Sequence, residues 1–302
     1  MKCFDLKLGF KCNNNCLHCV VANKRDTEDL NEEDIKNIID SIPKGEDYFV
    51  QITGGEPSLY KTLPYTLKLC KERGFYTVIQ TNGTGFANLQ YLQECKPYID
   101  HIHIAIHSCY PEIHDKIVGS TGMWSKTIHG LDNIIKEKIF FTTQTVLSNI
   151  NIDSLYDTFK FIQKKKRGTR MSMTYPHLNG NAYLNRDKIC FKYSEKSQII
   201  QKTLKKYHKY IFSESIPYCY LHPYAHKVES LERDIFCNLT RIGVDCSDGK
   251  DFVKDYNTLN LEEHCKGTLC KECIYDSVCI GVWKEYFELY GEELDLYPVM
   301  LK

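Results

Sequence analysis

Three cysteines near the start of the chain have the type and the spacing of metal ligands. They are Cys12, Cys16 and Cys19, in the run CNNNCLHC. Soft thiolates select zinc or iron–sulfur centres over hard cations. Because a cubane of four irons is normally held by four cysteines, three would leave one iron open to a ligand that is not protein. A zinc site that adds His18 is the alternative, but His18 adjoins Cys19, and four ligands on one ion would strain so short a loop.

A second cysteine group, Cys270, Cys273 and Cys279, lies near the other end of the chain. Zinc ribbons also use its CxxC spacing, so this group alone leaves zinc and iron–sulfur open. The chain has 15 cysteines and starts MKCFD, without an apolar signal region. An odd number of cysteines in clusters is typical of metal binding in a reducing compartment rather than of a disulfide framework. We therefore predict a metal-binding protein of the cytoplasm.

The composition argues against two classes of partner. Lys+Arg and Asp+Glu both number 39, so the formal net charge is +0 and no nucleic-acid or membrane partner is predicted. No apolar run approaches the roughly 18 residues that a membrane span needs. With 302 residues, 42% of them hydrophobic, the chain can form one large domain or one domain with an appendage.

The elements that must position the cysteines follow an alternating pattern. From residue 6 to about 176, short runs rich in β-branched and aromatic residues alternate with segments of helical period, as in stacked βα units. The predicted strands are 6–12, 48–53, 76–81, 101–107, 140–147 and 170–175, and the clearest helices are 31–42, 62–73, 124–138 and 153–166. Six units fall short of a closed barrel, so we predict an α/β fold of the partial (β/α)6 TIM type.

Unusual residues follow several of these strands at the ends where such barrels carry their chemistry. Cys12 ends the first strand, Gly54-Gly55-Glu56-Pro57 follows the second, Asn82-Gly83 the third and Ser108 the fourth. His101, His103 and His107 alternate with isoleucines and so point to one side of the sheet. They could line the barrel interior, although a plain structural role is the more common one.

The alternation is predicted to stop after residue 176. A long amphipathic stretch, 193–212, is predicted to form a helix, and a cysteine-rich tail follows. We place a core domain at 1–190 and the linking helix with the tail at 191–302. No Gly-, Ser- or Pro-rich linker separates the two parts, so we expect the tail to pack directly on the barrel.

The cysteine run, the GGEP segment and Thr81-Asn82-Gly83, in this order at strand ends, resemble the radical S-adenosylmethionine (SAM) enzymes. The resemblance covers about residues 1–180. It implies a [4Fe-4S] cluster on Cys12, Cys16 and Cys19, with SAM bound to the open iron. In that family, one electron from the cluster cleaves SAM to a 5′-deoxyadenosyl radical, which takes a hydrogen atom from the substrate. The catalytic acid or base is not indicated.

The resemblance also implies which residues hold SAM. Gly54 and Gly55, followed by Glu56 and Pro57, let the backbone approach the cofactor. Glu56 could receive the ammonium group of SAM through a charge-assisted hydrogen bond, and Asn82 belongs to the same set.

Three further positions are compared with the family in the same way. His18 stands where the family packs a side chain on the adenine, and Ser108 stands near a position that reaches the carboxylate. A cap for the helix that starts near Pro111 competes for Ser108. Many relatives carry an arginine for the SAM carboxylate where this chain has Val118. Lys116 is a weak substitute, and a surface lysine is the better interpretation.

The tail resembles the SPASM and twitch extensions, which hold auxiliary iron–sulfur clusters. Its CxxCxxxxxC spacing matches their centre, but no cysteine follows Cys279, so we expect one auxiliary [4Fe-4S] cluster. Cys219 is the first choice for its fourth ligand and Cys265 the second, with Cys237 and Cys246 as further alternatives. Buried structural roles are expected for the remaining cysteines, which are Cys3, Cys70, Cys95, Cys109 and Cys190.

Three function hypotheses follow. The leading one is oxidative modification or cross-linking of a ribosomally made peptide, with an electron donor such as flavodoxin or ferredoxin. Only 11 residues precede Cys12, so a leader peptide would bind the barrel, the tail or a separate peptide-binding protein. The second hypothesis is radical dehydrogenation or rearrangement of a sugar- or cyclitol-like small molecule. The third is a non-catalytic iron–sulfur or zinc protein, against which the GGEP and TNG segments argue.

Overall fold

A curled parallel sheet forms the frame of the protein. The computed structural model describes residues 2–43, 48–230, 241–244, 262–291 and 296–300. Its strands are β1 (Lys2–Lys7), β2 (Tyr48–Thr53), β3 (Tyr76–Thr81), β4 (His101–Ala105), β5 (Phe141–Val146), β6 (Met171–Thr174), β7 (Ile211–Glu214), β8 (Glu229–Ser230) and β9 (Arg241–Val244). The sheet order is β8-β7-β6-β5-β4-β3-β2-β1-β9, and all neighbours run parallel. The predicted partial TIM-type barrel is therefore confirmed.

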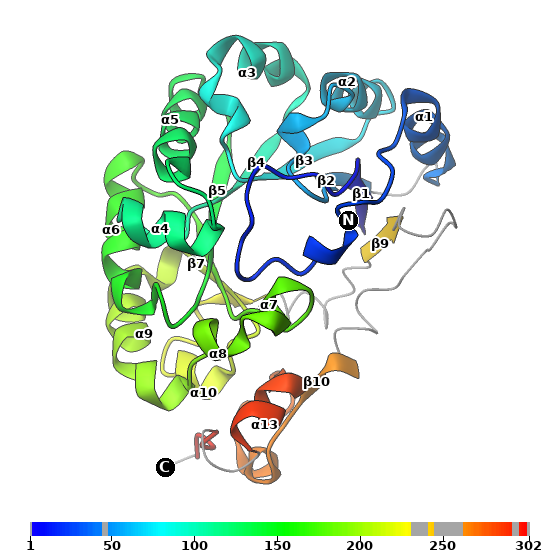
Figure 1. Cartoon of the computed structure of the whole chain (residues 1–302). Helices are drawn as coiled ribbons and strands as arrows, with labels where there is room; N and C mark the ends of the chain where they lie inside the picture. The colour runs from blue at the N-terminus through cyan, green and yellow to red at the C-terminus, as the bar shows by residue number, and fades with distance from the viewer. Residues whose placement is uncertain (1, 44–47, 231–240, 245–261, 292–295, 301–302) are drawn as a thin grey trace.

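Helices lie along the outer face of the sheet, beside the cysteine loop and in the tail. They are α1 (Glu32–Ser41), α2 (Leu63–Glu72), α3 (Leu89–Cys95), α4 (Pro111–Val118), α5 (Met123–Lys136), α6 (Leu155–Lys165), α7 (Asn181–Leu184), α8 (Arg186–Ile189), α9 (Tyr193–Tyr207), α10 (Tyr218–Leu221) and α13 (Lys284–Tyr290). In Figure 1, α1, α2, α3, α5, α6 and α9 surround the sheet, and the dark-blue segment after β1 lies inside the ring of helices. That segment carries Cys12, Cys16 and Cys19.

The first strand ends earlier than predicted. We expected a strand over 6–12, but β1 ends at Lys7. The alternation that misled the prediction is real, since Leu6, Leu8 and Phe10 are all buried. Beyond Lys7, however, the chain pairs with the loop after β2 instead of continuing the strand ladder. Cys12 therefore lies in a loop above the sheet rather than in a strand.

The helix predicted over 193–212 was too long, and a seventh strand was missed. Helix α9 ends at Tyr207, and β7 follows it and pairs with β6. The alternation of strands and helices thus continues past residue 176. Ile211 and Ser213 are both buried in the sheet, and this spacing of two residues fits a strand rather than a helix. Strands β7, β8 and β9 all come from the segment 191–302, whose boundary as a separate domain stays a prediction.

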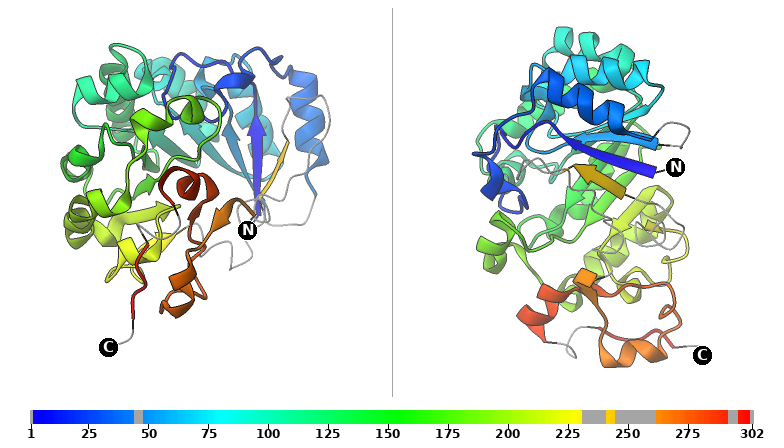
Figure 2. Two further views of the ribbon diagram at one scale, coloured as in Figure 1. Left: turned by 60° about the horizontal axis from the view of Figure 1, so that its bottom comes forward. Right: turned by 90° about the vertical axis from the view of Figure 1, so that its right-hand side faces the viewer.

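The tail packs on the barrel, as expected. Its described part holds the hairpin β10 (His264–Cys265) and β11 (Val282–Trp283), followed by α13. The Tyr286 hydroxyl of α13 accepts a hydrogen bond from the backbone N–H of Tyr193 at 3.0 Å. The Tyr286 ring also lies 5.5 Å from the ring of Tyr175, at the end of β6. Both views of Figure 2 show this orange and red segment against the sheet.

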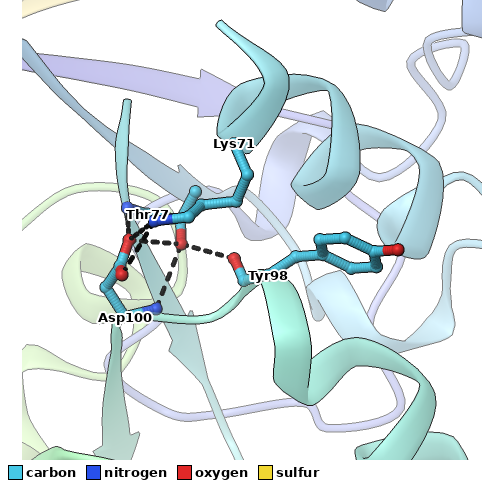
Figure 3. A network of polar contacts seen from close by, with 4 residues as sticks. All are labelled: Lys71, Thr77, Tyr98 and Asp100. Atoms are coloured by element: carbon cyan, nitrogen blue, oxygen red, sulfur yellow. Dashed lines mark hydrogen bonds and ion pairs between the residues drawn. The ribbon is translucent and has the colours of Figure 1, made fainter. Parts of the chain in front are cut away.

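The amino-terminal end of the barrel is closed by a polar network around Asp100 (Figure 3). The Asp100 carboxylate accepts hydrogen bonds from Lys71 Nζ at 2.9 Å and from the Thr77 backbone N–H at 2.7 Å. The Thr77 hydroxyl donates to the Tyr98 carbonyl at 2.6 Å. These contacts join α2, the start of β3 and the turn before β4. In TIM-type barrels this end serves stability, whereas chemistry lies at the opposite end.

The unfolding free energy is expected to fall in acid because of His101. Burial, followed by the charge of Arg170, lowers the pKa of His101 to about 4, and its Nε2 lies 2.9 Å from Thr142 Oγ1. In the unfolded chain, His101 is protonated below about pH 6.5, whereas in the folded chain it is protonated only below about pH 4. We expect His101→Asn to remove roughly 1 to 2 kcal/mol of the loss between pH 7 and pH 5, as measured by urea denaturation. Equal pH slopes for both proteins would contradict this.

Candidate active site

A cavity of about 440 Å³ lies at the carboxyl ends of the strands. The three cysteines line it together with four of the residues predicted to hold SAM. These residues are Cys12, Cys16, Cys19, Gly54, Gly55, Glu56 and Asn82. His18 also lines the cavity, whereas Pro57 and Ser108 do not. The structure thus brings most of the predicted site residues into one space, and their contacts with SAM stay predictions.

Gly54 and Gly55 allow two backbone segments to touch. The Gly55 N–H donates to the Gly9 carbonyl at 2.9 Å, and the Glu56 N–H donates to the Lys11 carbonyl at 2.9 Å. A Cβ atom on Gly54 would overlap the Gly9 carbonyl, and one on Gly55 would overlap the Lys11 carbonyl. Gly54 also has φ +110°, which favours glycine. The glycines therefore fix the segment that leads into Cys12.

Adding a methyl group at Gly55 is expected to break this contact. The clash is with a carbonyl and cannot be relieved by a side-chain rotation, so we expect Gly55→Ala to cost about 3 kcal/mol of stability and to lower the iron content after reconstitution. Gly74→Ala is the matched control. A Cβ there meets nothing within 4 Å and suffers only the strain of φ +81°, about 1 kcal/mol. Equal denaturation midpoints for the two variants would show that the contact is unimportant.

The Glu56 carboxylate ties the loops after β2 and β3 together. It is buried and accepts hydrogen bonds from the Ser58 hydroxyl at 2.6 Å, the Thr81 hydroxyl at 2.5 Å and the Asn82 N–H at 2.7 Å. Burial raises the pKa of Glu56, and these hydrogen bonds oppose the shift. Among the described residues, Oε2 accepts one hydrogen bond, from the Asn82 N–H. This oxygen keeps acceptor capacity in a side chain that lines the cavity.

Asn82 connects the third strand to the cysteine loop. Its Nδ2 donates to Asn13 Oδ1 at 2.8 Å and lies 4.0 Å from Cys12 Sγ. Asn13 in turn donates to the Thr84 hydroxyl at 2.8 Å. Amide donors around a cluster thiolate stabilise its negative charge. Asn82 thus supports the ligand loop as well as lining the cavity.

Helix α7 holds the cysteine loop from the other side. The Asn181 backbone N–H donates to the Cys19 carbonyl at 2.8 Å, and its side-chain amide donates to the Cys16 carbonyl at 3.1 Å. Gly180 comes so close that a Cβ would meet the carbonyls of Cys19 and Val20. Sequence reasoning missed this segment because α7 has only four residues and lies far from the cysteines along the chain.

The three thiols suit a cationic cluster. Burial raises the pKa of Cys12, and the amide of Asn14 opposes this through a hydrogen bond to Cys12 Sγ at 3.4 Å. Burial, followed by repulsion from Cys12 and Cys19, also raises the pKa of Cys16. Thiolates become stable there when positive metal compensates them. In the described residues no three His, Cys, Asp or Glu side chains are placed to hold a single metal ion, and a cubane spreads its cysteines over separate irons.

The half-buried His18 of the ligand loop lies next to two buried histidines, His107 and His114. The His18 ring lies 4.6 Å from the His107 ring, which lies 5.6 Å from the His114 ring. Burial lowers the pKa of His18 and of His114 to about 4 and that of His107 well below its usual value. All three are therefore neutral at pH 7. His107 lines the cavity, whereas His101 and His103 lie further down β4 and do not.

Ser108 and Lys116, the two residues considered as partners of the SAM carboxylate, do not line this cavity. The Ser108 hydroxyl accepts a hydrogen bond from the Tyr110 N–H at 3.1 Å and lies 3.1 Å from the Ser154 hydroxyl. Ser108 thus forms a turn before α4 but does not cap that helix, whose N-cap is Tyr110 with no side-chain cap hydrogen bond. Lys116 lines a separate surface groove, and Val118 faces the cavity without a charge.

Arg25 is a cavity residue that sequence reasoning missed. It follows the short 3-10 turn η1 (Ala22–Lys24). Its guanidinium lines the cavity and donates to the Asn14 carbonyl, inside the cysteine loop, at 2.7 Å. Its positive charge lowers the pKa of both Cys12 and Cys16, against the larger effect of burial. The only signal in the sequence was its position six residues after Cys19.

Four cysteines of the tail region face a second, small cavity. Cys219, Cys270, Cys273 and Cys279 all line it. Burial, followed by repulsion from Cys279, raises the pKa of Cys219. Two of the sulfurs accept backbone hydrogen bonds, from Val299 to Cys273 and from Gly281 to Cys279, each at 3.4 Å. Such N–H···S contacts are typical of metal-bound thiolates.

The other cysteines lie apart from this cavity. Cys265 Sγ lies 3.8 Å from the Val282 carbonyl and is not among the residues that line the cavity. Cys237 and Cys246 lie outside the described residues. Of the cysteines expected to be structural, four are buried: Cys3, Cys70, Cys95 and Cys190. The fifth, Cys109, is half-buried.

The family model of the radical SAM superfamily matches residues 6–162. This match spans the strands and loops that carry the first cysteine group, the GGEP segment and Asn82. The chain therefore belongs to the radical SAM superfamily. Membership implies an oxidoreductase-type catalyst with a [4Fe-4S] cluster and SAM, and the donors around the first cavity fit both groups.

Curated relatives of the chain act on different substrates. It is 26% identical over 160 residues to an Fe-coproporphyrin III synthase of Methanosarcina barkeri (52% of this chain, 39% of that protein). It is 25% identical over 158 residues to the mycofactocin maturase MftC of Mycolicibacterium smegmatis (51% and 39%). A probable GTP 3′,8-cyclase of Saccharolobus islandicus is 24% identical over 277 residues (87% and 86%). The chain spans about two fifths of the length of the first two.

Solved structures share the fold over nearly the whole chain. The structure of anSMEcpe with bound AdoMet and the Kp18Cys peptide matches with a TM-score of 0.68 at 14% identity, over 98% of this chain and 93% of that chain. Streptococcus suis SuiB bound to its precursor peptide SuiA matches with a TM-score of 0.64 at 15% identity, over 97% and 74%. Among the described residues, no helix is long and apolar enough to cross a membrane.

Proposed function

We propose that this chain uses radical SAM chemistry to modify a ribosomally made peptide oxidatively. The observation that carries the proposal is the second set of four cysteines, which face one cavity in a tail packed on the barrel. An auxiliary [4Fe-4S] cluster held by Cys219, Cys270, Cys273 and Cys279 would accept an electron from the substrate. Loss of a hydrogen atom, an electron and a proton then leaves the peptide oxidised by two electrons.

The size of the first cavity supports a peptide side chain as the reacting group. When bound, the cluster and SAM supply the one-electron reductive cleavage that generates a hydrogen-abstracting radical. A volume of 440 Å³ is at the low end of the range for one drug-sized ligand, roughly 300 to 1,000 Å³. With SAM in place, the remaining space suits a single side chain better than a nucleotide or a porphyrin. The peptide backbone would stay at the mouth of the cavity.

Different residues of this chain would bind the different groups of SAM. The cysteine loop binds the cluster, and Arg25 and Glu56 offer opposite charges on the cavity wall. A guanidinium suits the carboxylate of SAM, and a carboxylate suits its ammonium group. The neutral ring of His18 lies beside the ligands and suits stacking on the adenine.

Three neighbours support a peptide substrate. The titles of the anSMEcpe and SuiB structures name bound peptides, and MftC is a maturase. A small-molecule substrate is the second candidate, favoured by the probable GTP 3′,8-cyclase that aligns along 87% of this chain. We expect an electron donor of the flavodoxin or ferredoxin type in either case.

Anaerobic reconstitution with iron and sulfide tests the proposal. With reductant and SAM, the protein should form 5′-deoxyadenosine, and the metal content should be about eight irons per chain, four for each cubane. A short peptide encoded beside its gene should lose two hydrogens by mass spectrometry. Formation of 5′-deoxyadenosine that only a small molecule stimulates would favour the second candidate. No 5′-deoxyadenosine under any condition would refute the catalytic function.

A further inference from the structure

The wall of the cavity that β6, β7 and the tail form is distinct from the wall that carries the cysteines. It contains Thr174, Glu214, His177 and Trp283. The order of the sheet separates β7 from β2 and β3, whose loops adjoin the cysteine loop. The segment after β6 also reaches the cysteine loop, at Asn181, so a substrate beside the cluster and SAM meets this wall.

Glu214 is a carboxylate with unused bonding capacity. It is the last residue of β7 and is half-buried. Its Oε2 accepts one hydrogen bond, from the Thr174 hydroxyl at 3.2 Å. A carboxylate has about four acceptor positions. Among the described residues no lysine or arginine forms an ion pair with Glu214, so its negative charge is directed at the cavity without a partner.

The cations of the cavity have partners of their own. Lys7, at the end of β1, forms an ion pair with Asp5 at 2.9 Å. Arg25 binds the Asn14 carbonyl in the cysteine loop. Neither contact involves Glu214, so a positive group placed beside Glu214 gains attraction from it.

The imidazole in this wall is engaged by carboxylates other than Glu214. His177 lies 3.4 Å from a carboxylate oxygen of Glu285 and 3.9 Å from one of Glu263. Burial opposes the effect, but the hydrogen bond from His177 lowers the pKa of Glu285 below its usual value. His177 therefore pairs with these two carboxylates rather than with Glu214.

Ring contacts do not compete for the ligand at this wall. The Trp283 ring has His177 on one face, with centroids 4.2 Å apart and 12° between planes. The His264 ring also lies 3.8 Å from the Trp283 ring, tilted by 35°. Two histidine rings of the protein therefore already contact Trp283.

A pair of glutamines completes the floor of the cavity. Gln80 Nε2 of β3 donates to Gln144 Oε1 of β5 at 2.9 Å, across the small Ala105 of β4. The Gln80 oxygen then remains as an acceptor for a ligand, and the Gln144 nitrogen remains as a donor. If both amides are flipped, the two residues exchange these roles. That combination matches a peptide group.

We propose that Glu214 is the counter-ion of a basic side chain, of the lysine or arginine type, which the substrate inserts into this cavity. The Gln80–Gln144 pair binds the amide group next to that side chain. The identity of the substrate as a peptide rests on the proposed function. The subsite for a basic group rests only on the residues that line the cavity. A charge-assisted hydrogen bond to Glu214 orients the side chain toward the wall that carries the cluster.

Binding of two matched probes to the reconstituted holoprotein with SAM tests the subsite. The probes are Nα-acetyl-lysine methylamide and Nα-acetyl-norleucine methylamide, which differ in charge and little in shape. We expect calorimetric titration to show roughly tenfold tighter binding of the lysine probe. Glu214→Gln, which keeps the size and a polar contact to Thr174, should abolish this preference. Glu214→Asp should retain part of it.

Glu288→Gln is the control, because Glu288 is an exposed carboxylate of the tail outside the cavity. It should keep the full preference. Equal affinity for both probes in the wild type, or a preference that survives Glu214→Gln, would overturn the proposal. Iron content and SAM binding show whether each variant is folded. If the lysine preference depends on Glu214 while no peptide is modified, the subsite stands and the proposed peptide function fails.

Discussion

Replacing Cys219 with alanine is expected to lower the iron content of the reconstituted protein from about eight to about four atoms per chain. Cys219 faces the same cavity as Cys270, Cys273 and Cys279, and its thiol interacts electrostatically with all three. Removing one of four protein ligands leaves an iron open to solvent and makes the cluster labile. Iron and sulfide analysis together with Mössbauer spectroscopy would measure the loss.

Cys265→Ala is the matched control for this prediction. Cys265 lies in the same tail, and its sulfur is near the Val282 carbonyl rather than in the four-cysteine cavity. The variant should keep about eight irons. If Cys265→Ala loses half of the iron and Cys219→Ala does not, the fourth ligand is Cys265. The first cluster should survive in both variants, because its loop makes its contacts elsewhere.

Replacing Arg25 with glutamine is expected to weaken SAM binding roughly 10- to 100-fold. The guanidinium lines the cavity beside the cysteine loop, and Val118 supplies no charge there. A charge-assisted hydrogen bond to the carboxylate of SAM contributes about 1.5 to 3 kcal/mol, which corresponds to that loss in affinity. Equilibrium dialysis of the anaerobic protein with labelled SAM would measure it.

Two controls isolate the charge of Arg25. Lys24→Gln removes the adjacent cation, whose Nζ lies 5.5 Å from the Phe10 ring and which does not line the cavity, and it should bind SAM normally. Decarboxylated SAM lacks the group that Arg25 would bind, so its affinity should be nearly the same in wild type and Arg25→Gln. Equal losses for SAM and for the decarboxylated analogue would mean that Arg25 only shapes the loop through its contact with Asn14.

Much of the fold and the first site could be predicted from local patterns. β-Branched strands and strand-end turns located β2 and β3, and with them the loops that carry Gly55 and Asn82. The cysteine spacing located the ligand loop. Cys219 was chosen by resemblance, and the structure places it beside the other three thiols. Whether these groups bind clusters and SAM as expected stays a prediction.

The missed residues share a physical cause. Arg25 and Glu214 reach the cavity, and Asn181 reaches the cysteine loop, because the sheet curls and brings distant segments together. No local periodicity marks such residues, since each lies in a loop, a very short helix or a strand end. The seventh strand was missed for a related reason: residues 207–212 fit a helical period, and only pairing with β6 shows that Ile211 begins a strand.

Several of the contacts that hold the cysteine loop are made to its main chain. Asn15 and Leu17 donate their N–H groups to the carbonyls of Val118 and Ile117, at 2.8 and 2.9 Å. Arg25 and Asn181 bind loop carbonyls in turn. A main-chain hydrogen bond does not depend on the side chain of its residue, so substitutions of Leu17 leave these anchors and the positions of the three thiols in place.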